Sequence, residues 1–251
     1  MKKIENINYS PDENPQKILD LYLPENDVFD VFIYFHGGGI ESGNKSHADA
    51  FCEYLTQRNI AVVSADYRMY PDAVYPEFIR DAAQAVGWVY KNIQSYGNCK
   101  RYFVGGSSAG GYLSMMLCFD KKYLTPYGID PATIDGFIHD AGQPTCHFNV
   151  LRERGIDTRR VIIDESAPIF HIGTAPEYAP MLFIVSDNDM ENRYEQTMLM
   201  LSTLKHFEYD QDKIKLKVMH GSHCRYVWEK DENQDSVLGK IVYEFQKQLT
   251  E

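Results

Sequence analysis

Short, nearly continuous apolar runs alternate along the chain with longer runs in which apolar residues recur every three or four positions. The short runs predict strands, and their lack of polar alternation indicates strands that are covered on both faces, as in a parallel sheet. The predicted strands span residues 18–22, 30–35, 60–65, 102–105, 136–139, 181–186 and 214–219.

The longer runs predict amphipathic helices between these strands. Apolar side chains keep helical spacing from Phe78 to Ile93 and from Val237 to Leu249, and two more helices are expected over about 109–119 and 191–207. Strands that alternate with helices predict an α/β fold, a mostly parallel sheet built from right-handed βαβ units. The stretch 142–180 shows no clear element, so we expect it to form a small lid insert over the site.

Composition and charge narrow the class of protein. The absence of any linker-like stretch favours a single domain over all 251 residues. The formal net charge of −11 argues against nucleic acid or an anionic membrane surface as partner. The polar N-terminus shows no signal peptide, and no apolar run approaches the ~20 residues of a membrane span. Five scattered cysteines without a C-x-x-C pattern suit free thiols in the cytoplasm.

The strongest chemical motif is the glycine-rich turn GGSSAGG at 105–111, which contains G-x-S-x-G with Ser108 at its centre. It follows a predicted strand and precedes a predicted helix, the setting in which this motif forms a nucleophile elbow. The turn places Ser108 at a helix N-terminus, where the helix dipole favours developing negative charge. A glycine-rich turn that holds phosphate is the alternative interpretation, although the dinucleotide pattern G-x-G-x-x-G is not matched.

A second motif, HGGG at 36–39, directly follows the predicted strand 30–35. Glycines leave main-chain N–H groups unshielded, so a negatively charged oxygen can approach them. We therefore predict that the N–H groups of Gly38, Gly39 and Ala109 form an oxyanion hole, with His36 as the anchor of the loop. The simpler alternative is a flexible loop around a buried histidine.

A serine nucleophile needs a base and an acid that orients the base. His223 is the favoured base because it follows the strand 214–219 and precedes the last helix, with His220 as its rival. Asp187 and Asp189 both follow a strand end, where the catalytic loops of open α/β sheets gather. Of the two, Asp189 is favoured as the acid. Glu191 is expected to begin the next helix. His220 and His223 lack a third ligand, so no metal site is predicted. The proposed chemistry needs no other cofactor.

These motifs together resemble the α/β-hydrolase superfamily, in particular small HGGG-type esterases related to hormone-sensitive lipase, acetyl-xylan esterases and kynurenine formamidase-like enzymes. Further matching segments are LDLYLP at 19–24, DYR at 66–68 followed by Pro71 and Tyr75-Pro76, and SAP at 166–168. The resemblance implies helices on both faces of the sheet. It also implies that the acid follows an S/G-x-x-D pattern, which is Asp189 here, and that His223 is the base.

Several charged and sulfur-containing residues have a less specific interpretation. The DYR group at 66–68 is expected to hold loops near the site rather than to act on substrate. Arg152, Arg154, Arg159 and Arg160 are interpreted as a solvated surface of the insert, the alternative being recognition of a carboxylate on the substrate. Cys224, beside His223, is expected to be a packed thiol rather than a redox switch.

The resulting hypothesis is a serine hydrolase that cleaves carboxylic esters, with short acyl groups on a small alcohol or sugar. Only 35 residues precede His36, which leaves little length for an N-terminal cap and favours small acyl groups. Two alternatives stay open at this point. One is an amidase or formamidase on the same residues, and the other is a non-catalytic ligand-binding relative.

Overall fold

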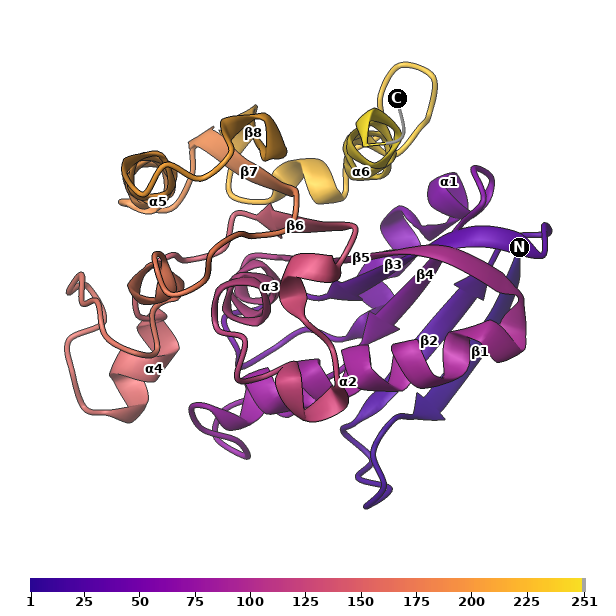
Figure 1. Ribbon diagram of the computed structural model, residues 1–251, viewed down its shortest axis with the longest axis horizontal. Helices are drawn as coiled ribbons and strands as arrows, with labels where there is room; N and C mark the ends of the chain where they lie inside the picture. Colours follow the sequence, from indigo (N-terminus) through magenta and orange to yellow (C-terminus); the bar gives the residue numbers. More distant parts are fainter. Residues whose placement is uncertain (250–251) are drawn as a thin grey trace.

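The computed structural model describes residues 1–249, which form one eight-stranded sheet in the order β1-β2-β4-β3-β5-β6-β7-β8 (Figure 1). Strand β2 runs antiparallel to both of its neighbours, and the strands from β4 to β8 are parallel. The strands are β1 (Lys2–Asn8), β2 (Ile18–Leu23), β3 (Val28–Phe35), β4 (Ile60–Ala65), β5 (Asn98–Ser107), β6 (Gly136–Asp140), β7 (Met181–Asn188) and β8 (Ile214–Ser222).

Helices cover both faces of this sheet. Helices α2 (Glu77–Asn92) and α3 (Ala109–Phe119) lie on one face, and α1 (Cys52–Thr56) and α6 (Val237–Gln248) on the other (Figure 1). Helix α5 (Arg193–His206) contributes its buried apolar side chains to the core that α2 and α3 share. The central strands therefore lie between two apolar layers, which explains why their sequences are apolar without alternation.

The α/β architecture predicted from the sequence is confirmed. Every predicted strand and helix is present, and β4 and α3 have the predicted bounds. Strand β1 was missed because it is a polar edge strand without a continuous apolar run. Helices α1 and α4 (Phe148–Glu153) are too short to show helical periodicity. The predicted start of α5 was wrong by two residues, because Glu191 lies outside the helix and Asn192 is its N-cap.

Residues 142–180, here called segment 142–180, contain α4 and a short 3₁₀ turn, Pro168–His171. The Tyr112 hydroxyl of α3 donates a hydrogen bond to the Ser166 carbonyl oxygen at 2.7 Å. The Asn149 side-chain amide donates to the Gly39 carbonyl oxygen at 2.9 Å. Segment 142–180 is therefore fastened both to the helix that follows the serine turn and to the HGGG loop.

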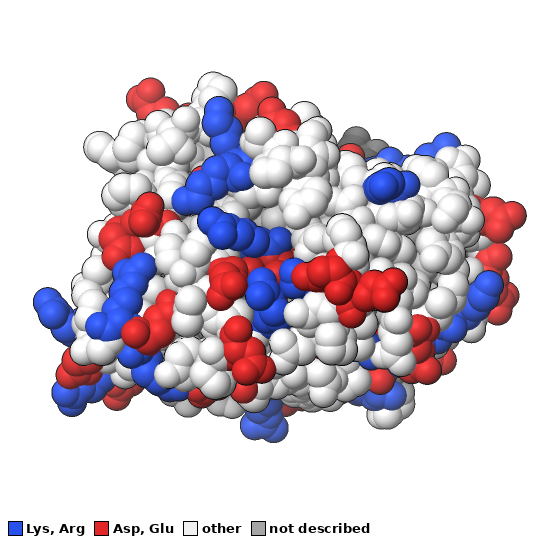
Figure 2. Space-filling model, turned by 90° about the horizontal axis from the view of Figure 1, so that it is seen from below, with Lys and Arg blue, Asp and Glu red and all other residues white. Residues whose placement is uncertain are grey.

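The surface mixes charges of both signs. Basic and acidic side chains are interspersed over the face shown in Figure 2, although the chain carries a net charge of −11. None of the helices within residues 1–249 combines the length and the apolar character that crossing a bilayer requires.

Candidate active site

Ser108 occupies a strained turn between β5 and α3. Its φ is 55° and its ψ is −112°, a conformation that costs a non-glycine residue on the order of 1–3 kcal/mol. A Cβ atom at Gly106 would lie 2.5 Å from the Phe35 carbonyl oxygen, and one at Gly110 would clash with the same oxygen. Both flanking positions of the motif thus require glycine, because the turn packs directly against the end of β3.

The structure brings Ser108, His223 and Asp189 together. The Nε2 atom of His223 lies 2.8 Å from the Ser108 hydroxyl oxygen, and its Nδ1 atom lies 2.5 Å from a carboxylate oxygen of Asp189. Ser108 follows β5, while Asp189 and His223 follow the ends of β7 and β8. The carboxyl ends of parallel strands meet at one edge of a sheet, which explains how residues so far apart in sequence converge.

The Asp189 side chain is fully buried and well hydrogen-bonded. Burial by itself would raise the pKa of Asp189, but hydrogen bonds from His223 and two main-chain amides outweigh it, so the pKa lies below its ordinary value. The amides are those of Ser186, at 3.1 Å, and Met190, at 2.8 Å. An ionised Asp189 holds the proton on Nδ1 of His223 and leaves Nε2 free to accept a proton from Ser108.

His220 and Asp187, the less favoured candidates for base and acid, pair with each other and not with Ser108. Nδ1 of His220 lies 2.7 Å from a carboxylate oxygen of Asp187, and the His220 side chain is 97% exposed. The hydrogen bond that His220 donates to the Asp187 carboxylate raises the pKa of His220. Of these two Asp–His pairs after β7 and β8, the one that contacts Ser108 is Asp189–His223.

The HGGG loop lies against the serine turn with free N–H groups. A Cβ atom at Gly37 would lie 3.2 Å from the Cβ atom of Ser108. Gly38 and Gly39 have φ values of 119° and 67°, which L-residues rarely adopt. Throughout residues 1–249, no hydrogen bond is donated by the N–H groups of Gly38, Gly39 and Ala109. These three donors are therefore available to a developing negative charge beside Ser108.

His36 anchors this loop through its contacts with Tyr67, as the sequence indicated. Its buried ring stacks on Tyr67 at 4.6 Å between centroids, and the Tyr67 hydroxyl donates to the His36 carbonyl oxygen at 2.9 Å. Burial lowers the pKa of His36 to about 4, so its imidazole is neutral at pH 7. Arg68 makes a bidentate pair with Asp81, at 2.8 and 3.0 Å. The DYR group thus supports the loop and does not contact Ser108.

Substitution of Gly38 by alanine tests the loop. The new Cβ atom would clash with the Ser42 carbonyl oxygen, so the loop must shift away from Ser108. We expect kcat for the reaction at Ser108 to fall about 10²- to 10³-fold, the usual cost of losing one oxyanion donor. Gly128→Ala is the matched control, because Gly128 also has a positive φ of 71° but open space around it. A Gly38→Ala variant as active as Gly128→Ala would contradict the assignment.

A cavity of about 380 Å³ opens over Ser108. Its walls include Phe148 from α4, Met190, and Trp228, which is 56% exposed and meets the edge of His47 at 4.9 Å. None of these wall residues was predicted from the sequence. Trp228, which follows His223 closely and is one of two tryptophans, was the available hint.

Comparison with known families shows to which family this chain belongs. Residues 77–250 match the prolyl oligopeptidase family, and residues 19–126 match the family described as BD-FAE. This chain belongs to the prolyl oligopeptidase family. The predicted resemblance to α/β-hydrolases is thereby confirmed, whereas the finer HGGG-type assignment stays a prediction.

Individual relatives of this prolyl oligopeptidase family member match only part of it. An AB hydrolase superfamily protein of Schizosaccharomyces pombe is 38% identical over 105 residues, which are 41% of this chain and 30% of that protein. An isoprenylcysteine alpha-carbonyl methylesterase of Arabidopsis thaliana is 31% identical over 105 residues, which are 41% of this chain and 25% of that protein. The chain thus spans less than a third of the length of these relatives.

A solved structure shows the same fold over nearly the whole chain. The crystal structure of esterase B from Lactobacillus rhamnosis aligns with a TM-score of 0.80 at 17% identity. The alignment covers 99% of this chain and 86% of that one. The mostly parallel sheet of this prolyl oligopeptidase family member is therefore an α/β-hydrolase sheet.

Cys224 lines the cavity over Ser108. Its Sγ atom lies 3.7 Å from Nε2 of His223, and its side chain is half-buried. Burial raises the pKa of Cys224 well above its ordinary value, so the thiol stays protonated at neutral pH. This favours the predicted role as a packed thiol, since the thiolate is the reactive form of cysteine.

Asp140, the last residue of β6, lies buried beneath the serine turn of this prolyl oligopeptidase family member. The Ser108 N–H group donates to its carbonyl oxygen at 2.7 Å, and the Tyr226 hydroxyl donates to its carboxylate. Burial raises the pKa of Asp140 to about 6. The folded protein therefore holds a proton on this carboxyl up to a higher pH than the unfolded chain does.

The pH dependence of stability follows from this difference. Between about pH 4 and 6 the unfolded chain loses the Asp140 proton first, so the contribution of this one carboxyl to stability falls as pH rises. Relative to wild type, Asp140→Asn should gain up to about 3 kcal/mol in unfolding free energy over this interval. Urea denaturation from pH 4 to 8 checks this, and a pH-independent difference would contradict it. The carboxyl of Asp187 has a lowered pKa, so the unfolding free energy of Asp187→Asn relative to wild type should change with pH in the opposite sense.

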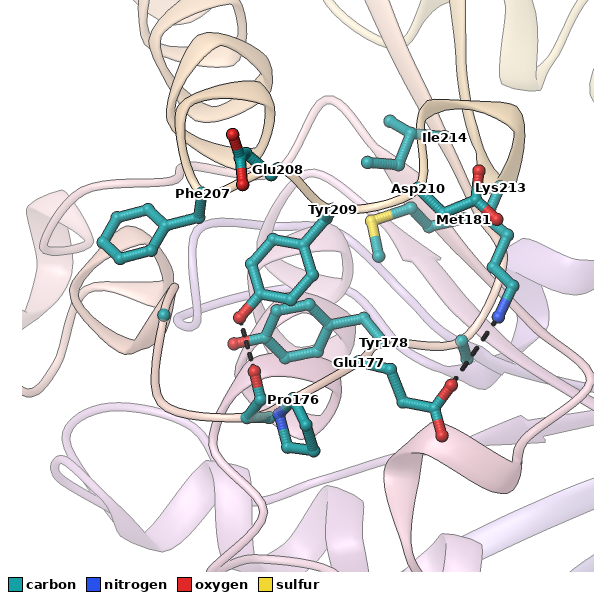
Figure 3. Close-up of a pocket in the computed structure, with 13 residues that line it drawn as sticks. Pro176, Glu177, Tyr178, Met181, Phe207, Glu208, Tyr209, Asp210, Lys213 and Ile214 are labelled. Atoms are coloured by element: carbon teal, nitrogen blue, oxygen red, sulfur yellow. Dashed lines mark hydrogen bonds and ion pairs between the residues drawn. The ribbon is translucent and has the colours of Figure 1, made fainter.

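A separate hollow of about 460 Å³ lies where β7 and β8 begin, at the ends of these strands away from Asp189 and His223 (Figure 3). It is lined by Met181 and Ile214, the first residues of these strands, and by Lys213, whose Nζ atom lies 3.8 Å from Glu177. It contains none of the predicted site residues. Within residues 1–249, no three or more His, Cys, Asp or Glu side chains are grouped to hold a metal ion.

Proposed function

We propose that this protein hydrolyses carboxylic esters through an acyl-enzyme on Ser108. The observation that carries the proposal is the continuous chain from the Ser108 hydroxyl through His223 to the buried Asp189, at 2.8 and 2.5 Å. Free N–H groups of the HGGG loop lie beside the same hydroxyl. The methylesterase among the sequence relatives also supports ester hydrolysis.

In the proposed reaction, the Ser108 oxygen attacks the ester carbonyl carbon while its proton passes to Nε2 of His223. The carbonyl oxygen becomes negatively charged and accepts hydrogen bonds from the N–H groups of Gly38, Gly39 and Ala109. The tetrahedral intermediate collapses as the C–O bond to the alcohol breaks, and the alkoxide takes the proton from His223. A water molecule then attacks the acyl-enzyme by the same steps, releasing the acid and restoring Ser108.

We further propose that the substrates carry short acyl groups, such as acetyl, on a small alcohol or sugar. A cavity of about 380 Å³ is at the small end of the range for ligand sites, and Phe148 and Met190 limit its width. The five free cysteines favour action in a reducing compartment, the cytoplasm. No nucleic acid or membrane partner belongs to this proposal.

A panel of p-nitrophenyl esters tests the proposal. The highest kcat/KM is expected for the acetyl ester, with a decline toward longer acyl chains and a burst of p-nitrophenol equal to the enzyme concentration. The matched anilide of acetic acid should react far more slowly. A higher kcat/KM for the anilide or for N-formyl compounds would favour an amidase or formamidase. Tight binding without turnover of any ester would favour a ligand-binding protein.

A further inference from the structure

A second cavity, of about 450 Å³, adjoins the catalytic one. Phe148 and Met190 line both cavities, so the two share a wall. The Phe148 ring also packs against the HGGG loop, since a Cβ atom at Gly39 would lie 3.0 Å from it. A group bound in the second cavity would therefore lie next to the ester that Ser108 attacks.

The floor of this second cavity contains a buried arginine. Arg193, the first residue of α5, is 4% exposed and lines the cavity. Its guanidinium donates to the carbonyl oxygen of Ala141 and to the side-chain oxygen of Gln143, which also accepts the Phe148 N–H group at 3.2 Å. Asp189 attracts Arg193 electrostatically, but within residues 1–249 no carboxylate lies within ion-pair distance of it. This buried cation therefore retains N–H donors for a ligand, since a guanidinium carries five.

The rim of the same cavity belongs to segment 142–180. Three of its four arginines form ion pairs with acidic neighbours: Arg152 with Glu41, Arg154 with Asp164 and Arg159 with Asp157. The fourth, Arg160, lines the cavity, is exposed and makes no side-chain hydrogen bond or ion pair with any residue in 1–249. Arg160 and Arg193 thus face one cavity from two different elements.

We propose that this cavity binds a carboxylate on the substrate, so that the preferred esters carry a negative charge. The inference rests on the proposed ester hydrolysis and specifies its substrate class. The planar guanidinium fork matches the two oxygens of a carboxylate, and a buried cation gains most from an anionic partner. Arg159, which pairs with Asp157, and Glu191 line the same cavity. With Arg159 neutralised by Asp157, the charges of Arg160, Arg193 and Glu191 leave a small positive excess, which favours a monoanionic carboxylate over a doubly charged phosphate.

Matched pairs of esters test this inference. One pair differs on the acyl side, p-nitrophenyl hemisuccinate against p-nitrophenyl butyrate, and the other on the alcohol side, 3-acetoxybenzoate against phenyl acetate. For at least one pair, wild type should show a kcat/KM about tenfold higher for the charged ester. The ratio of charged to neutral kcat/KM should fall about tenfold in Arg160→Gln and further in Arg160→Glu. Arg154→Gln, a variant of an ion-paired arginine outside the cavity, is the matched control and should keep the wild-type ratio.

The outcomes separate this inference from the proposed function. Equal ratios in wild type, Arg160→Gln and Arg160→Glu, with the neutral esters hydrolysed, would overturn carboxylate recognition and leave ester hydrolysis standing. A ratio that falls equally in Arg154→Gln would also overturn it, because the effect would then be general charge. Wild-type enzyme that hydrolyses neither member of either pair would contradict ester hydrolysis itself.

Discussion

Replacement of Ser108 by alanine is expected to reduce kcat for ester hydrolysis by about 10⁴- to 10⁶-fold, the usual cost of removing a serine nucleophile. Alanine keeps the Cβ atom and fits the same turn, at a φ of 55°, as well as serine does. The loss is therefore expected without a change in fold or melting temperature. Turnover of p-nitrophenyl acetate together with circular dichroism measures both.

Ser107 supplies the control for this experiment. It is the last residue of β5, directly before Ser108, but it is 3% exposed, and within residues 1–249 its hydroxyl makes no hydrogen bond with His223. We expect Ser107→Ala to change kcat by no more than a few-fold. A large loss in Ser107→Ala with full activity in Ser108→Ala would contradict the assignment of the nucleophile.

Asp189→Asn is expected to lower kcat by about 10³- to 10⁴-fold. An asparagine amide can donate its N–H to Nδ1 of His223, which moves the imidazole proton to Nε2, where it can no longer accept the proton of Ser108. The pH–rate profile should lose its neutral plateau for the same reason. Measurement of kcat from pH 5 to 10 checks both expectations.

Asp187→Asn is the matched control for Asp189→Asn. It makes the same chemical change two positions earlier, in the exposed pair with His220. We expect it to keep at least half of the wild-type kcat. Equal losses in the two variants would mean that the exposed pair takes part in the reaction, contrary to the geometry.

Much of the fold was predictable from the sequence because each central strand is covered on both faces. Strand β4 is fully buried, and its apolar run 60–65 has the bounds of the observed strand. Strand β1 pairs along only one edge and is half-exposed, so solvent contact removes the apolar run that would reveal it. Helix α4 has six residues, less than two turns, and no periodicity can appear over that length.

The residues placed around Ser108 were predictable because each belongs to a local motif at a strand end. The G-x-S-x-G turn needs glycine at 106 and 110 for close packing against Phe35, and both glycines can be recognised in the sequence as part of the motif. Phe148 and Arg193 could not be predicted, because their roles depend on how segment 142–180 and α5 pack against each other. Arg193 is buried yet bears a charge, and the sequence alone favours a solvated position for such a residue.

The central claim is that Ser108 is the nucleophile, and covalent capture tests it most directly. An organophosphonate p-nitrophenyl ester should release one equivalent of p-nitrophenol as the phosphorus atom bonds to the serine oxygen. Intact mass should then increase by one phosphonyl group, and peptide mapping should place that group on Ser108, with no adduct in Ser108→Ala. Labelling of Ser107, or no labelling of folded protein that hydrolyses esters, would contradict the account.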